Sequence, residues 1–200
     1  MKIYAENGQN YMSFKRTHIS FRSQAKVVIW IAAVVTIVEI LNLFLGRSLN
    51  VFGLMPREIN GLVGIVIAPF LHGSLMHYMS NIVPLCIFSF LLLQHGVVRF
   101  NLVTFVCIVV SGLLVWMFGR TAIHVGASGL IYGYFGYLLL AGWLSRELKL
   151  ILISLFIGVG YGGLVFGILP SNPYISWEGH LFGFVSGLGC ALIWGRVKKK

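Results

Sequence analysis

The sequence predicts an all-α membrane protein, a bundle of six transmembrane helices. Three observations predict it: 58% of the 200 residues are hydrophobic, only 10% are charged, and the apolar residues fall into long runs separated by short polar segments. Soluble domains carry roughly 25% charged residues, so this composition lies far outside that class. The bilayer is therefore the solvent for which the chain is built.

Six apolar runs are candidates to cross the hydrocarbon core, which is about 30 Å thick and takes about 20 residues of helix. The runs are 27–45, 77–93, 100–118, 128–144, 148–166 and 179–197. A seventh stretch, 62–71, contains Gly64 and Pro69 and is too short to span. We expect it to lie at the membrane interface or to lead into the second span.

The composition divides the chain into three parts. A polar segment, 1–26, is expected to be a flexible cytoplasmic tail, the membrane core covers 27–197, and 198–200 form a basic end. The first apolar run is longer than the apolar core of a signal peptide and lacks a small-residue cleavage site. We therefore expect it to remain in the protein as an anchor.

The basic residues indicate the orientation. With the N-terminus inside, 12 of the 15 Lys and Arg residues fall in inner segments, and the outer loops hold only Arg47, Arg57 and Arg120. By the positive-inside rule both termini face the cytoplasm, and the short tail favours a bacterial inner membrane. Basic flanks of this kind contact anionic lipids, whereas no other feature indicates nucleic-acid binding. The oligomeric state stays open.

Polar side chains within the predicted spans gather toward the outer side. Polar groups at such positions are functional candidates by default, because burying them in a membrane costs free energy unless they are hydrogen-bonded. At about 1.5 Å of rise per residue, Ser128 lies about 22 Å, His180 about 21 Å and Asn81 about 20 Å above the inner boundary. Three spans thus bring a hydroxyl, an imidazole and an amide to one depth, and water must reach them through a cavity.

The chemistry predicted for this depth is nucleophilic catalysis. Serine is a weak nucleophile until a base removes its proton, and a neutral histidine can do so, which makes Ser128 and His180 a candidate catalytic dyad. Gly126 and Gly129 keep the space around the hydroxyl open to a substrate carbonyl. His77 and Asn81, at positions i and i+4 of one helix, can donate hydrogen bonds to the oxyanion that develops.

Small residues predict how the dyad is brought together. On the sixth span Gly183 and Gly187 share a face with His180, and on the fourth span Gly129 and its neighbours offer a matching small surface, so the two backbones can pack closely. The chain contains no aspartate, which excludes a Ser-His-Asp triad. We expect Tyr132 to support the imidazole, and Glu178 to point away from it.

Other polar residues are expected to be structural. We expect His72 to hold the outer loop to the second span, His124 to be a loop residue without a role, and Glu39 with Asn42 to form hydrogen bonds between helices. A metal or haem protein that uses His72, His77, His124 and His180 is the alternative from another class. No carboxylate or thiol joins these histidines, so no metal and no cofactor is expected.

Three motifs together resemble the rhomboid family of intramembrane serine proteases. They are the His-x4-His-x3-Asn run from His72 through His77 to Asn81, the Gly-x-Ser-Gly of 126–129, and His180 followed by Gly183 and Gly187. They stand in the family's order on the second, fourth and sixth predicted spans. The resemblance covers roughly residues 27–197.

The resemblance implies a rhomboid-like bundle that cuts single transmembrane helices of substrate proteins near their outer end. It implies a Ser128–His180 dyad, an oxyanion hole of Asn81, His77 and the Ser128 amide, and a mobile cap over 167–177. The first outer loop, 46–61, lacks the Trp-Arg pair of relatives, and Gly179 replaces a frequent alanine. The runner-up function is an inactive rhomboid-like protein that binds or escorts membrane helices.

Overall fold

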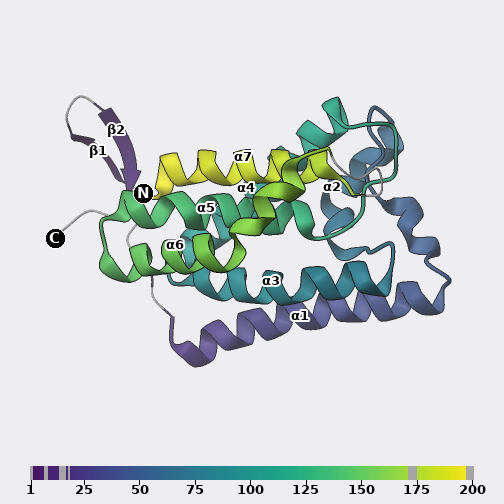
Figure 1. Cartoon of the computed structure of the whole chain (residues 1–200), viewed down its shortest axis with the longest axis horizontal. Coiled ribbons are helices and arrows are strands. Elements are labelled where there is room, and N and C mark those ends of the chain that lie inside the picture. The colour runs from purple at the N-terminus through teal and green to yellow at the C-terminus, as the bar shows by residue number, and fades with distance from the viewer. Residues whose placement is uncertain (1, 7–8, 14–16, 18, 171–174, 197–200) are drawn as a thin grey trace.

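The computed structural model describes residues 2–6, 9–13, 17, 19–170 and 175–196. It is a bundle of helices that run roughly along one direction (Figure 1). The bundle helices are α1 (Phe21–Phe44), α3 (Leu75–Leu93), α4 (Val97–Phe118), α5 (Ser128–Ser145), α6 (Leu148–Tyr161) and α7 (Trp177–Trp194). The basic end predicted at 198–200 and the middle of the predicted cap, 171–174, lie outside the described residues.

The membrane fold class is confirmed. Within the described residues, four stretches are long and apolar enough to cross a membrane: α1, α3, α4 and the helical run Leu148–Ile168, which joins α6 to the 3₁₀ helix η4 (Gly162–Ile168). The helices α5 and α7 have 18 residues each and carry the glycines and polar groups of the predicted site. Six spans stay a prediction, since α5 and α7 are less apolar than the other four.

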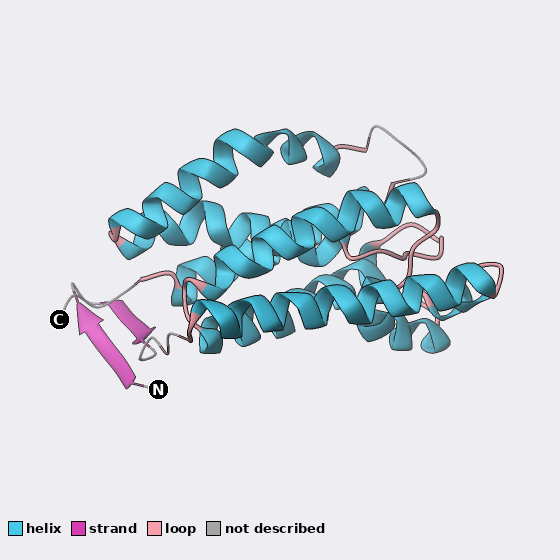
Figure 2. Ribbon diagram, turned by 90° about the horizontal axis from the view of Figure 1, so that it is seen from below, coloured by secondary structure: helices cyan, strands magenta, loops and turns pink. Residues whose placement is uncertain are grey.

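The N-terminal segment differs from its prediction. Strands β1 (Lys2–Glu6) and β2 (Gln9–Ser13) pair antiparallel, with Lys2 opposite Ser13, and β2 contacts α7. The hairpin lies at one end of the bundle (Figure 2). An Asn-Gly pair between the strands is a sequence signal for such a turn. Helix α1 begins at Phe21 rather than at residue 27, because Ser20 caps it by accepting a hydrogen bond from the Ser23 amide at 3.2 Å.

The short stretch 62–71 is confirmed as a segment that does not span. It breaks into η2 (Ile59–Val63), α2 (Gly64–Ile67) and η3 (Ala68–Phe70), preceded by η1 (Ser48–Phe52). Backbone hydrogen bonds of 3.0 and 2.8 Å pair Leu54 with His124. Arg57 donates to the Gly119 carbonyl at 2.7 Å and to the Thr121 hydroxyl at 2.8 Å. These contacts anchor the loop 46–61, which has no Trp-Arg pair, to the loop before α5.

Glu39 and Asn42 do not join two helices as expected. Both are buried on α1, yet both bond to the outer loop: the Arg47 guanidinium donates to Glu39 at 2.9 Å, and Asn42 donates to Asn50 at 2.9 Å. The reason is the position of α1, which packs against α3 at the edge of the bundle. The chain that follows α1 folds back over its outer end and meets these side chains first.

The closest packing in the bundle is between α5 and α7. The Gly129 carbonyl occupies the space that a Cβ at Gly183 would need, and the Gly133 carbonyl does the same at Gly187. A Cβ at Gly136 would lie 2.5 Å from the carbonyl oxygen of Phe184. The predicted small-residue interface is therefore present, and it brings two backbones into direct contact over several turns.

Substitution at this interface should destabilise the bundle. We expect Gly187→Ala to lower the stability of the folded protein by about 1–3 kcal/mol, because its methyl group must displace backbone rather than a side chain. Gly189→Ala on the same helix is the matched control, since a Cβ there has nothing within 4 Å. Thermal unfolding in detergent measures both, and equal midpoints for the two variants would contradict the interface.

Candidate active site

Ser128 is the first residue of α5 and is half-buried. The turn before it needs glycine at Gly126, where φ is +117°, a value that side chains rarely adopt. The first N–H groups of a helix have no partner within the helix and carry its positive dipole end. The hydroxyl of Ser128 therefore lies beside backbone amides that can stabilise a negative charge by donating hydrogen bonds.

His180 has two close partners that fix its ring. Its ring is 8% exposed and stacks on Tyr132, with ring centroids 4.1 Å apart and an interplanar angle of 9°. Its Nδ1 lies 2.8 Å from the Gly167 carbonyl oxygen. A carbonyl only accepts, so Nδ1 carries the hydrogen and Nε2 keeps a lone pair. The expected support by Tyr132 is present.

The Gly167 carbonyl is a functional group that the sequence did not indicate. It lies in η4, and a Cβ at Gly167 would fall 3.4 Å from Nδ1 of His180 and even closer to the Tyr132 hydroxyl. Only glycine fits there without displacing the Tyr132 hydroxyl, whereas His180 would remain at an ordinary contact distance. The Tyr132 hydroxyl donates to the Leu164 carbonyl at 2.9 Å, so η4 holds both rings of the stack.

The structure brings the dyad helices together at the level of the dyad. A Cβ at Gly129, next to Ser128, would lie 3.4 Å from the carbonyl oxygen of Gly179, next to His180. Tyr132, one turn after Ser128, is the residue on which the His180 imidazole stacks. Glu178 points away, as expected: its carboxylate lies 3.7 Å from the Arg120 guanidinium.

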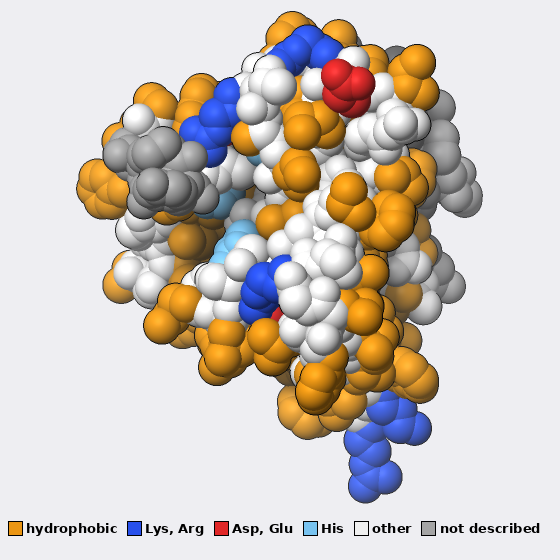
Figure 3. Space-filling view, turned by 90° about the vertical axis from the view of Figure 1, so that its right-hand side faces the viewer, with side chains coloured by type: hydrophobic (Ala, Val, Ile, Leu, Met, Phe, Trp, Pro, Cys, Tyr) orange, Lys and Arg blue, Asp and Glu red, His pale blue; other side chains and the backbone are white. Residues whose placement is uncertain are grey.

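His77 lies against the serine turn, and Asn81 lies one helical turn after His77. A Cβ at Gly126 would lie 2.6 Å from Nε2 of His77, so the imidazole packs directly on that glycine. Asn81 is 4% exposed and donates an amide hydrogen to the His77 carbonyl at 2.7 Å. Histidine side chains are visible in a depression at this end of the molecule (Figure 3).

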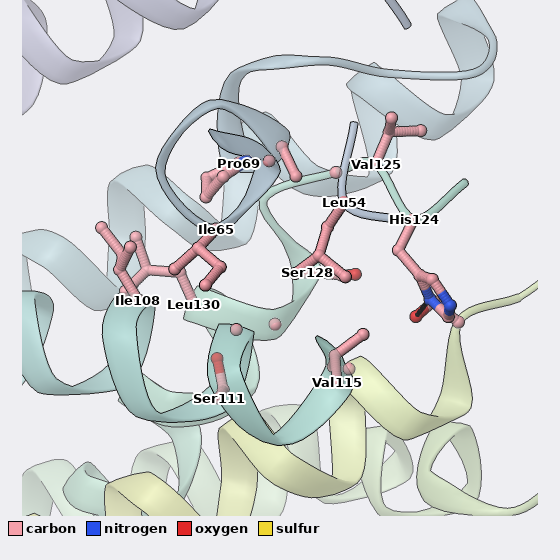
Figure 4. A pocket seen from close by; sticks show the side chains of 17 residues that line it. Leu54, Ile65, Pro69, Ile108, Ser111, Val115, His124, Val125, Ser128 and Leu130 are labelled. Atoms are coloured by element: carbon pink, nitrogen blue, oxygen red, sulfur yellow. Dashed lines mark hydrogen bonds between the residues drawn. The ribbon is translucent and has the colours of Figure 1, made fainter. Parts of the chain in front are cut away.

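A pocket of about 490 Å³ opens beside Ser128 (Figure 4). The loop 46–71, α4 and the start of α5 form its walls, and Ile65, Ser111, Val115 and Val125 are among its lining side chains. The sequence predicted that a cavity admits water at this depth but did not indicate its walls, because they come from segments far apart in the chain.

His124 has a structural position, contrary to expectation. It is 7% exposed, and its ring lies 3.1 Å from the Arg120 carbonyl oxygen and 2.6 Å from the Ser176 hydroxyl. Since the carbonyl accepts, Nε2 donates to it and Nδ1 accepts from Ser176. Burial lowers the pKa of His124, against the opposing effect of the Arg120 carbonyl. The neutral ring thus links the loop before α5 to the residue preceding α7.

The histidines do not form a metal site. In the described part of the chain, no group of three or more His, Cys, Asp and Glu side chains is arranged to hold a metal ion. His72 contacts His77 ring to ring, but His124 and His180 have their own partners.

Comparison with known proteins decides the family. The family described as Rhomboid domain matches residues 60–197, which include every element of the candidate site. The chain belongs to the rhomboid family. Within this rhomboid, the matched region begins in the outer loop and runs through α7, so the dyad helices and both candidate oxyanion donors fall inside it.

Relatives of this rhomboid occur in bacteria and plants. An uncharacterized protein of Mycobacterium bovis is 33% identical over 182 residues, 86% of this chain and 76% of that protein. An uncharacterized protein of Mycobacterium leprae is 30% identical over 177 residues, 84% and 70% of the two chains. Rhomboid-like protein 1 of Arabidopsis thaliana is 32% identical over 121 residues, 58% and 30%.

The stack on His180 can be tested through the reactivity of Ser128. We expect Tyr132→Ala to slow labelling by a fluorophosphonate about tenfold, a fraction of the 10²–10⁴ that a positioned base contributes. Tyr132→Phe keeps the ring and should label close to wild type. Labelling rates of the purified variants measure this, and an unchanged rate in Tyr132→Ala would show that the ring does not hold the base.

Proposed function

We propose that this rhomboid is an intramembrane serine endopeptidase that hydrolyses peptide bonds in or near the transmembrane segments of membrane proteins. The observation that carries the proposal is the fixed tautomer of His180. Nδ1 lies 2.8 Å from the Gly167 carbonyl oxygen and Tyr132 supports one face of the ring, so Nε2 is the nitrogen left to act as a base.

In the proposed reaction, Nε2 of His180 takes the Ser128 proton as Oγ attacks the scissile carbonyl carbon. The carbonyl oxygen becomes an oxyanion that accepts hydrogen bonds from the Ser128 amide, His77 and Asn81. The C–N bond then breaks as His180 gives its proton to the leaving amine, and an acyl ester remains on Ser128. A water molecule, deprotonated by His180, hydrolyses the ester and restores the hydroxyl.

The lining of the pocket beside Ser128 supports a peptide substrate. Ile65, Val115 and Val125 are among its apolar lining side chains, and ligand sites are lined mostly by such side chains. Mostly apolar walls favour an apolar or small side chain next to the cleaved bond. In the proposed topology both termini are cytoplasmic, six helices span a bacterial inner membrane, and the site faces the outer side with 167–177 as its cap.

The decisive test is cleavage itself. We expect Ser128→Ala and His180→Ala to abolish cleavage of a single-span substrate in proteoliposomes, because each removes one half of the dyad. Ser186→Ala is the matched control, since its hydroxyl only donates to the Phe182 carbonyl within α7. Mass spectrometry of the products gives the cut site. Full activity in Ser128→Ala would exclude Ser128 as the nucleophile, and a wild type that cleaves no substrate would leave the helix-binding, inactive rhomboid-like alternative in place.

The oxyanion role of Asn81 makes a separate prediction. We expect Asn81→Ala to lower kcat about 10²–10³-fold with little change in KM, as for loss of one oxyanion-hole donor. Steady-state kinetics on the same substrate measure the two constants. A rise in KM at unchanged kcat would assign Asn81 to substrate binding instead.

A further inference from the structure

A buried acidic side chain lies outside the proposed dyad. Glu39 on α1 is 2% exposed, and its Oε1 accepts from the Arg47 guanidinium at 2.9 Å. Its Oε2 lies 3.7 Å from Nδ1 of His72. Burying a carboxylate in a membrane helix costs free energy even when the carboxylate is paired. An apolar side chain at this position of α1 would avoid that cost. The other contacts of Arg47 suggest what the Glu39–Arg47 pair does.

Arg47 holds the backbone immediately before α3. Its second terminal nitrogen donates to the His72 carbonyl at 2.6 Å, and Asn50 donates to the same oxygen at 3.2 Å. Asn42 fixes Asn50 in turn through a 2.9 Å hydrogen bond. Two donors from the outer loop, both anchored on α1, therefore fix the orientation of the peptide group between His72 and Gly73.

The other end of that peptide group reaches His77. The Gly73 N–H donates to Nδ1 of His77 at 3.5 Å. With Nδ1 an acceptor, the neutral ring carries its hydrogen on Nε2, which is the atom packed on Gly126 beside the catalytic serine. Hydrogen bonds at the two ends of one peptide group strengthen each other. The Arg47 guanidinium bound to the His72 carbonyl therefore makes the Gly73 N–H a stronger donor.

His72 itself adds no charge beside the peptide group between His72 and Gly73. Its ring is completely buried and lies edge-on to the rings of His77, at 5.2 Å, and Tyr78, at 5.6 Å. Burial, with the charges of His77 and Arg47, lowers the pKa of His72 to about 3. His72 is therefore neutral, and Arg47 is the charged group on the peptide that precedes His77.

We propose that Glu39 and Arg47 are positioning residues that set the tautomer of His77 through the peptide group between His72 and Gly73. Glu39 fixes the guanidinium, the guanidinium fixes the carbonyl, and the Gly73 N–H directs the His77 hydrogen toward the oxyanion. The chain without aspartate thus uses a carboxylate on the oxyanion side of the site rather than behind the catalytic histidine. The kinetic part of this inference rests on the proposed protease function.

The test combines kinetics with the tautomer of His77. We expect Glu39→Gln and Arg47→Gln to lower kcat about tenfold at similar KM, less than the 10²–10³-fold cost of losing an oxyanion donor outright. ¹⁵N NMR of histidine-labelled protein in detergent, with His77 assigned by His77→Gln, should show its Nδ1 unprotonated in wild type. Both variants should shift His77 toward a mixture of tautomers.

Arg57→Gln is the matched control. Arg57 has a left-handed backbone like Arg47 and also holds a loop by donating to a carbonyl, but it bonds to 119–121 rather than to the peptide before His77. The Arg57→Gln variant should be less thermally stable than wild type, with an unchanged kcat and an unchanged tautomer of His77. An unchanged His77 tautomer in folded Glu39→Gln and Arg47→Gln would overturn the inference. If wild type cleaves no substrate, the protease proposal fails, and the NMR result still decides this one.

Discussion

The close contact between α5 and α7 is the constraint on which the rest of the structure depends. Glycines at 129, 133, 183 and 187 let carbonyls of one helix fill space that side chains would otherwise take. That proximity sets Gly129 against Gly179, and so places the serine and histidine turns together. The same approach leaves room for Tyr132 to stack on His180, since no larger side chain intervenes.

At His180 a backbone carbonyl takes the position that a carboxylate has in a Ser-His-Asp triad. A carbonyl from η4 fixes the Nδ1 hydrogen, and an aromatic ring fixes the plane of the imidazole. Both groups are uncharged, whereas a buried carboxylate at this position would need its own compensation. The charged residues of the outer half pair instead with loops: Glu178 with Arg120, and Glu39 with Arg47.

The outer loops connect these parts into one rigid end of the bundle. The loop 46–61 bonds to His72 through Arg47 and to 119–124 through Arg57 and the backbone of Leu54. His124 passes the connection on to Ser176, just before α7. Helices α5 and α7 therefore each begin at a segment that another loop holds. The pocket beside Ser128 is enclosed by the same segments.

The sequence alone determined the membrane fold and the glycine interface, and it predicted Ser128, His180 and the candidate oxyanion donors. Apolar length and the depth of polar residues are local properties of the chain, and motif spacing is readable without coordinates. It did not reveal the carbonyl of Gly167, the partners of His124, the walls of the pocket, or the path from Glu39 to His77. These depend on backbone groups and on segments far apart in sequence, which carry no residue-type signal, so only the tertiary structure decided them.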